Sequence, residues 1–264
     1  MKTFIASVLM FAAGSAAAHT SCDLELNAGL RISGDSIEVY DADDAVYTIV
    51  DDQYLQVNGQ QLALTGAQQT AVANYAASIR AAVPEVRGMA LDGIDLAIDA
   101  ITITFDGLLG ENNQVSAQLM TELTNVKSDV NRYFSSGKPI SFNRENKSVP
   151  DFLGKQFETR IERIMETSVQ NSIGSIMFAV GREVLKSGGD MQAFEARMNK
   201  FGEQIEQQMN ARTSAMEARG EKLCTVMQAV DAHEEQFKQA IPAVESFDMI
   251  HMNSAEKHIA QQKI

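Results

Sequence analysis

The sequence has no tryptophan, only four prolines and only two cysteines among its 264 residues. It also has no apolar run long enough to cross a bilayer as a helix, which takes about 20 residues. The longest candidate, residues 173–180, is short and is interrupted by Gly174. We therefore expect no transmembrane helix and no stable insertion into a membrane.

Basic residues are scarce too. There are 22 Lys and Arg against 35 Asp and Glu, which gives a formal net charge of −13. A chain of this sign repels phosphate backbones, and no basic stripe is visible, so we expect no nucleic-acid partner. The acidity favours solubility and the attraction of cations or basic partners.

Motifs of catalysis are missing as well. The sequence has no Gly-x-Ser-x-Gly elbow, no phosphate-binding glycine loop and no Cys-x-x-Cys pair. The run that starts at His233 and Glu234 begins like the helix of a zinc protease, but Phe237 stands where the second histidine would be. We therefore predict no catalytic residue and no cofactor.

The N-terminus carries the strongest positive signal. Lys2 is the only charge before an apolar stretch over residues 4–13, and the small residues Ala16, Ala17 and Ala18 follow. A charged start, a short apolar centre and an Ala-x-Ala exit are typical of a secretory signal peptide over residues 1–18. We expect cleavage after Ala18 and export from the cytosol. Loss of Lys2 leaves 21 basic against 35 acidic residues, a net charge of −14.

Export bears on the two cysteines, Cys22 and Cys224, because an exported chain meets an oxidising environment. An even count permits complete pairing, so we predict a Cys22–Cys224 disulfide between the N-terminal strand and a C-terminal helix. Loop entropy bounds its stabilisation at about 5 kcal/mol. The alternative is that both cysteines are buried free thiols.

Residues 19–64 alternate apolar and polar positions, which is typical of half-buried strands. Asn58 and Gly59 separate two such runs and favour a type I′ hairpin turn. That register places Leu55 opposite Leu62 on one apolar face. We predict an antiparallel β-meander of four or five strands.

At Thr65 the apolar period changes to that of a helix. Thr65 and Gln68 resemble a capping box at the start of a helical segment over residues 65–136. Pro84 should end or kink the first helix near Ala82. A second helix should then cover residues 84–109, although residues 101–105 would also suit a strand. A third helix should cover residues 113–134.

The remaining segments follow from composition and period. We predict a polar linker over residues 137–150, a helical bundle segment over residues 151–245 and a flexible tail over residues 246–264. The predicted fold class is therefore α+β: an N-terminal antiparallel β-meander followed by a mainly helical bundle with long amphipathic C-terminal helices.

The longest predicted helix starts near residue 190 and carries a stripe of methionine and phenylalanine. Four residues of this stripe are Met198, Phe201, Ile205 and Met209. Core packing is the commonest use of such a stripe, because methionine fills irregular cores. The functional hypothesis is an adaptable apolar groove that holds unfolded chains or lipid tails. We treat these four residues as a possible binding surface for a protein or peptide partner.

A family resemblance lies mainly between residues 54 and 97. Its elements are Tyr54-Leu55-x-Val57-Asn58-Gly59, Leu64-Thr65, Gln69, Tyr75, Ile79-Arg80 and Pro84-Glu85. Together with the signal peptide and the early Cys22, they resemble the YggN-like family of exported proteins of Gram-negative bacteria. The function of that family is unknown. The resemblance implies a periplasmic location and a mainly helical body, and it supplies no catalytic residue.

These observations favour a periplasmic, non-catalytic binding or interaction protein of the cell envelope, with a chaperone-like role as one form of it. A first alternative is an envelope hydrolase whose carboxylates the sequence does not pair. Glu158, Glu162 and Glu166 share a predicted helix face but alternate with arginines, as a solvated face does. A second alternative is a periplasmic metal carrier with His251 and His258 as weak candidate ligands. The oligomeric state stays open.

Overall fold

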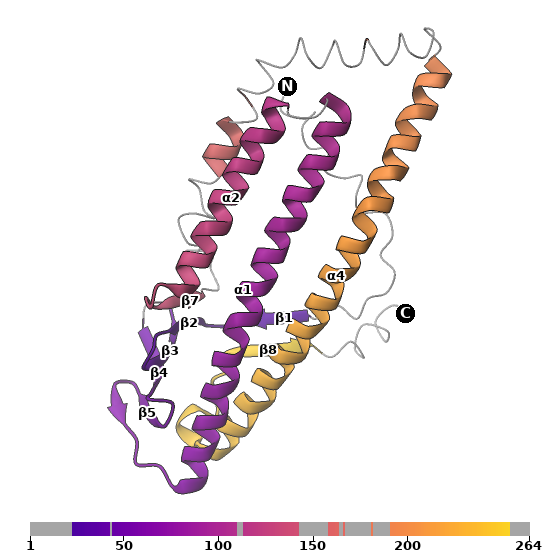
Figure 1. Ribbon diagram of the computed structural model, residues 1–264. Helices are drawn as coiled ribbons and strands as arrows, with labels where there is room; N and C mark the ends of the chain where they lie inside the picture. The colour runs from indigo at the N-terminus through magenta and orange to yellow at the C-terminus, as the bar shows by residue number, and fades with distance from the viewer. Residues whose placement is uncertain are drawn as a thin grey trace, which may run out of the picture.

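The computed structural model describes residues 23–42, 44–109, 113–142, 158–163, 166, 181 and 191–253. Figure 1 shows a β-rich body from which long helices project side by side. These helices are α1 (Gly66–Leu109), α2 (Gln114–Ser135) and α4 (Met191–Ala240). Antiparallel strands followed by long helices confirm the predicted α+β class.

Six strands form one antiparallel sheet in the order β6-β5-β4-β3-β2-β7. Their bounds are β2 (Gly29–Ile32), β3 (Ser36–Asp41), β4 (Asp44–Val50), β5 (Tyr54–Val57), β6 (Gln60–Gln61) and β7 (Ile140–Phe142). Asn58 and Gly59 have φ angles of 49° and 75°, the positive values that a type I′ turn needs. The Leu62 N–H donates to the Leu55 carbonyl at 2.9 Å, so the predicted hairpin register is confirmed.

Two segments that were expected to be irregular contain strands. The linker predicted over residues 137–150 includes β7, which pairs with β2. The flexible tail predicted over residues 246–264 includes β8 (Ile250–Asn253), which pairs with β1 (Asp23–Leu26) as a separate two-stranded sheet. Both predictions were wrong for these residues, because such short strands show no period and their partners are far away in the sequence. The end of the tail, residues 254–264, lies outside the described residues.

The first helix is longer than expected. The Thr65 N–H donates to Gln68 Oε1 at 2.9 Å, and the Gln68 N–H donates to Thr65 Oγ1 at 3.4 Å, so the capping box is confirmed. The helix then continues through Pro84 to Leu109, where two helices were expected, and residues 101–105 are helical. A proline inside a helix costs about 3 kcal/mol. Packing on both sides of Pro84 offsets that cost, since Ala82 is buried in the core and Val86 meets α4 around a shared cavity.

The main core lies where the six-stranded sheet packs against the first part of α1 and the last part of α4. Tyr75 of α1 stacks on Phe237 of α4 with ring centroids 5.0 Å apart, and Tyr47 of β4 meets Phe237 at 5.4 Å. All three side chains are almost completely buried. The body is therefore built from segments at both ends of the described chain.

Beyond the core, α1 lies between α2 and α4, and the parts of α1, α2 and α4 that extend from the body form what we call the arm (Figure 1). Helices α1 and α4 are antiparallel: Gly88 faces Arg219, and Gly107 faces Phe201. Because α1 has a neighbour on either side, every residue from 85 to 106 is half-buried. This explains why the apolar residues of this part of α1 do not keep to one stripe.

Acidic side chains along α1 pair with basic side chains of both neighbours. The N–O distances are 2.6–3.0 Å for Glu85–Lys222, Asp92–Arg219, Asp95–Lys127 and Asp99–Arg212. Partly exposed ion pairs of this kind contribute about 0–1 kcal/mol each. We infer that these ion pairs set the register between the helices of the arm and contribute little to the free energy of unfolding.

Candidate functional site

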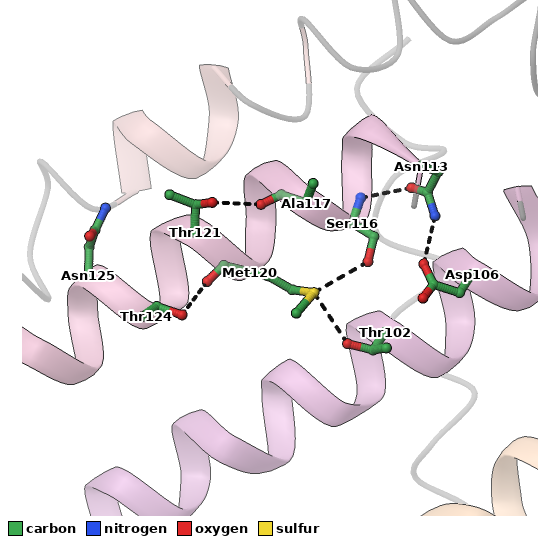
Figure 2. Close-up of a pocket in the computed structure, with 9 residues that line it drawn as sticks. All are labelled: Thr102, Asp106, Asn113, Ser116, Ala117, Met120, Thr121, Thr124 and Asn125. Atoms are coloured by element: carbon green, nitrogen blue, oxygen red, sulfur yellow. Dashed lines mark hydrogen bonds between the residues drawn. The ribbon is translucent and has the colours of Figure 1, made fainter. Parts of the chain in front are cut away.

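A cleft lined mostly by polar residues lies between α1 and α2. It has a volume of about 560 Å³. Figure 2 shows its lining residues, Thr102, Asp106, Asn113, Ser116, Ala117, Met120, Thr121, Thr124 and Asn125. Asn113 donates to Asp106 Oδ1 at 2.9 Å and accepts the Ser116 N–H at 2.8 Å, so it caps α2 and ties it to α1.

The threonine hydroxyl groups in this cleft also form hydrogen bonds, to carbonyls of their own helix. Thr121 and Thr124 donate to carbonyls one turn earlier in α2, at 2.8 and 2.7 Å. The Thr102 hydroxyl lies 2.8 Å from the Ile98 carbonyl and 3.5 Å from Met120 Sδ. Most of the bonds drawn in Figure 2 therefore lie within α2 and its cap, whereas those of Asn113 to Asp106 and of Thr102 to Met120 join the two helices.

A second space, at the junction of body and arm, is apolar. It is a cavity of about 180 Å³ between the sheets, α1 and α4. Every residue that lines it has an apolar side chain: Leu24, Leu26, Leu30, Ile32, Ile79, Ala82, Val83, Val86, Phe142, Leu223, Met227, Val230 and Met249. Leu24 keeps 38% of its surface exposed, so the cavity reaches the surface of the molecule at β1.

The size of this cavity limits what it can hold. An apolar cavity of about 150 Å³ lined by similar side chains stays free of water and binds benzene. A cavity of about 180 Å³ therefore has room for a group of about six carbon atoms. A polar ligand would lose its hydrogen bonds to water there and find no replacement.

One wall of the cavity comes from the β1–β8 sheet and the residue before β8. Leu24 and Leu26 of β1 line it together with Met249. The backbone N–H of Met249 donates to Glu234 Oε1 at 2.7 Å, and that of Ile250 donates to Glu234 Oε2 at 3.0 Å. The Glu234 carboxylate on α4, only 1% exposed, therefore fastens this wall to the helix with both oxygens.

A buried polar cluster surrounds this carboxylate. Burial raises the pKa of Glu234 to about 7, against the backbone hydrogen bonds that lower it. The Tyr47 and Tyr75 hydroxyls lie 3.0 Å apart, and Tyr75 lies 3.5 Å from Met249 Sδ. Burial, followed by neighbouring charge, raises the pKa of both tyrosines well above the usual range. Met249 thus joins the polar cluster to the apolar cavity.

Glu234 escaped prediction from the sequence, although a signal was there. It lies four residues after Val230 and three before Phe237, both of which are buried. A carboxylate within an apolar helix face is unusual, because burying an unpaired charge is costly. The lining of the cavity was also missed, since it combines six segments that no local pattern brings together.

The predicted binding surface lies on the arm and not at the cavity. Met198, Phe201, Ile205 and Met209 are all half-buried on α4. The Phe201 ring packs so closely on Gly107 that an added Cβ would lie 2.3 Å from it. Part of this stripe is therefore helix packing, and its use as a binding surface stays a prediction.

The residues named for the two alternatives do not converge. His251 is exposed on strand β8, with Nδ1 3.7 Å from Asp248 Oδ2. His258 lies outside the described residues. Glu158, Glu162 and Glu166 are exposed. Across the part of the chain that the structure describes, no three His, Cys, Asp or Glu side chains are grouped to hold a metal ion.

Of the two cysteines, Cys224 is half-buried on α4. Cys22 directly precedes β1 and lies outside the described residues. The disulfide between them therefore stays a prediction.

Fold and cavity define an α+β protein in which a meander, two long helices and a terminal two-stranded sheet enclose an apolar space. The chain belongs to the family described as "Protein of unknown function (DUF2884)", which matches residues 22–250. No curated protein and no solved structure matched the chain. Within the described ranges, no helix is both long enough and apolar enough to cross a membrane.

Proposed function

We propose that this protein is an exported, non-catalytic binding protein of the cell envelope that holds the end of an alkyl chain in the cavity beside β1. The observation that carries the proposal is the wholly apolar lining of a space that reaches the surface. An alkyl chain suits this lining better than a peptide does. A peptide would bring backbone N–H and C=O groups, and the lining offers them no hydrogen-bond partner.

The expected affinity is modest. Each buried CH₂ contributes about 0.8 kcal/mol, so about six carbons contribute roughly 5 kcal/mol before the costs of association. An isolated six-carbon chain should therefore bind no more tightly than a Kd of about 0.2 mM, and the costs of association weaken this to the millimolar range or beyond. A natural amphiphile would add contacts between its head group and the rim.

The proposal also includes the periplasmic location of the protein and its Cys22–Cys224 disulfide. The signal-peptide pattern over residues 1–18 and the resemblance to the YggN-like family support export to the periplasm. Leu24, two residues after Cys22, and Leu223, next to Cys224, line the same cavity. This neighbourhood supports a Cys22–Cys224 bond that fastens the start of β1 to α4.

A titration with 1-hexanol tests the proposal. Methionine methyl groups labelled with ¹³C report on the site, because Met227 and Met249 line the cavity whereas Met120 and Met198 lie on the arm. We expect saturable shifts of the Met227 and Met249 signals and unchanged Met120 and Met198 signals. Shifts spread evenly over all the methionines, or none at millimolar hexanol, would contradict the proposal.

A matched pair of variants locates the ligand. Ala82 lines the cavity, whereas Ala81, its neighbour on α1, is exposed. Ala82→Phe should fill the space and abolish hexanol binding, whereas Ala81→Phe should bind as the unchanged protein does. If Ala82→Phe does not fold, Val86→Phe fills the same space from one turn further along α1. Tighter binding of an unfolded apolar peptide than of hexanol would instead favour the chaperone-like role.

Neither alternative gains a specific observation. A pKa of about 7 suits a general acid, but both Glu234 oxygens bind backbone N–H groups out of reach of solvent. The candidate metal ligands lie apart or outside the described residues. We therefore keep the binding function as the single proposal.

A further inference from the structure

The β1–β8 sheet is attached to the body in an unusual way. It is separate from the six-stranded sheet, and Asn27 and Ala28 lead from β1 directly into β2. The Asn27 N–H donates to the Met249 carbonyl at 2.8 Å, which keeps the two terminal strands together as one unit. The backbone of this unit is fastened to α4 by the two hydrogen bonds that Glu234 accepts.

The same unit closes the apolar cavity. Leu24, Leu26 and Met249 supply its side of the lining, and α1 and α4 supply much of the remainder. A swing of this unit about the start of β1, which carries Met249 and β8 away from α4, would open the cavity beside Met249. It would also expose the Glu234 carboxyl group to water.

We propose that the β1–β8 sheet is a movable wall of the cavity and that the Glu234 carboxyl group is the latch that holds it closed. The latch regulates the site described above, so its role in ligand entry rests on the proposed function. The wall and its release rest on these hydrogen bonds and on the burial of Glu234, and they are testable without a ligand.

The direction of the pH effect follows from linkage. In the closed state, burial holds the pKa of Glu234 at about 7. In the open state the hydrated carboxyl group returns towards its ordinary value of 4.5. The closed state therefore binds the proton more tightly, so acid favours closure and rising pH favours opening. Between pH 5.5 and pH 8 the opening equilibrium should shift on the order of tenfold.

Other charged and titratable groups face the latch. Asp231, Glu235 and Lys238 lie on the same helix; Asp248 and His251 flank or belong to β8; Tyr47 and Tyr75 come from β4 and α1. Asp248 raises the pKa of Glu234, and the Lys238 ammonium lowers it. The Lys238 ammonium forms ion pairs with Asp248, at 2.8 Å, and with Glu235. Its hydrogen bonds therefore go to these two carboxylates and not to Glu234.

Hydrogen exchange of single amides tests the latch in the intact chain. The protection of the Met249 and Ile250 amides, corrected for intrinsic exchange, should fall on the order of tenfold from pH 5.5 to pH 8. Amides of β4, an inner strand of the six-stranded sheet, serve as the internal reference and should keep their protection. Protection at Met249 and Ile250 that does not change with pH would overturn the proposal.

Two variants assign the effect to one carboxyl group. Glu234→Gln cannot ionise, so its Met249 and Ile250 amides should lose the pH dependence. Glu221→Gln removes an exposed carboxylate from the same helix and should behave as the unchanged protein. Equal pH dependence in Glu234→Gln would refute the latch. If that variant does not fold, the ¹³C titration of the Glu234 carboxyl group decides instead, because its midpoint must coincide with that of the loss of protection.

Failure of the latch and failure of the proposed function give different results. Saturable hexanol binding without pH-dependent protection would remove the latch and leave the binding function. If protection depends on pH but hexanol does not bind, the movable wall is supported and the proposed ligand is refuted. If both hold, the rate of hexanol association should rise with pH in the unchanged protein and stay constant in Glu234→Gln.

Discussion

Glu234 is a carboxyl group placed where the apolar core would otherwise be continuous. Its neighbours on the helix face, Val230 and Phe237, are buried to the same degree. Burial of a carboxylate costs several kcal/mol unless hydrogen bonds compensate it. Here the compensation comes from two backbone N–H groups of the terminal strand region, which would themselves lack partners without it. The residue and the strand therefore depend on each other.

The free energy of unfolding should depend on pH through the Glu234 carboxyl group. Unfolding returns Glu234 from a pKa of about 7 to 4.5, so the folded state binds the proton more tightly between these values. The free energy of unfolding, relative to that of Glu234→Gln, should therefore decrease by up to about 3 kcal/mol as the pH rises from 5 to 8. Urea unfolding at a series of pH values measures this difference. A difference that increases with pH would show that the hydrogen bonds outweigh burial.

The elements that the sequence predicts correctly are those that are determined by interactions between residues close together in the sequence. The Asn58-Gly59 turn and the Thr65–Gln68 capping box each lie within a few residues and came out as expected. Helix α2 did as well, because it has one buried stripe that includes Leu119 and Val126. Each of these features is decided by neighbours in the sequence.

The elements that the sequence did not reveal depend on distant partners. Strands β7 and β8 have three or four residues each and are strands because β2 and β1 pair with them. The apolar cavity depends on the same pairings, because Phe142 belongs to β7 and Met249 directly precedes β8. The site could therefore not be predicted before the topology was known.

The continuity of α1 gives a test at Pro84. This residue is exposed, so its replacement removes no core contact. Pro84→Ala restores a backbone N–H within the helix and should raise the free energy of unfolding by about 1–3 kcal/mol. Urea unfolding followed by circular dichroism measures the change. An unchanged or lowered stability would indicate that the helix is interrupted at this position in solution.

The packing of the arm gives a second test, on two glycines. An added Cβ at Gly107 would lie 2.3 Å from the Phe201 ring, whereas one at Gly202 would meet nothing within 4 Å. Gly107→Ala should therefore lower the melting temperature, because the ring must move. Gly202→Ala should raise the free energy of unfolding by about 0.5–1 kcal/mol through helix propensity. Equal effects of the two substitutions would refute the contact between α1 and α4.

At the scale of the whole molecule, both ends of the described chain meet on one body. Strand β1 pairs with β8, and both lie against the junction of α1 and α4 (Figure 1). A covalent link between the start of β1 and α4 would fix one edge of this arrangement. It would leave β8 as the edge that the Glu234 carboxyl group controls.

The Cys22–Cys224 bond can be tested on the exported protein. Peptide mapping without reductant should recover the two cysteines in one linked pair of peptides. Reduction should lower the free energy of unfolding by about 2–5 kcal/mol, and Cys224→Ser should show no further loss on reduction. Alkylation of both thiols in the unreduced protein would show that the bond does not form.

The central claim is that the cavity at the junction of body and arm holds an alkyl chain. A crystal structure of the protein soaked with 1-bromohexane tests it most directly, because the anomalous signal of bromine marks the chain. We predict a bromine peak and chain density within the cavity, in contact with Leu26, Val86 and Leu223, and neither in crystals of Ala82→Phe. An empty cavity at saturating bromohexane, or bromine found only on the outer surface of the helices, would contradict the account.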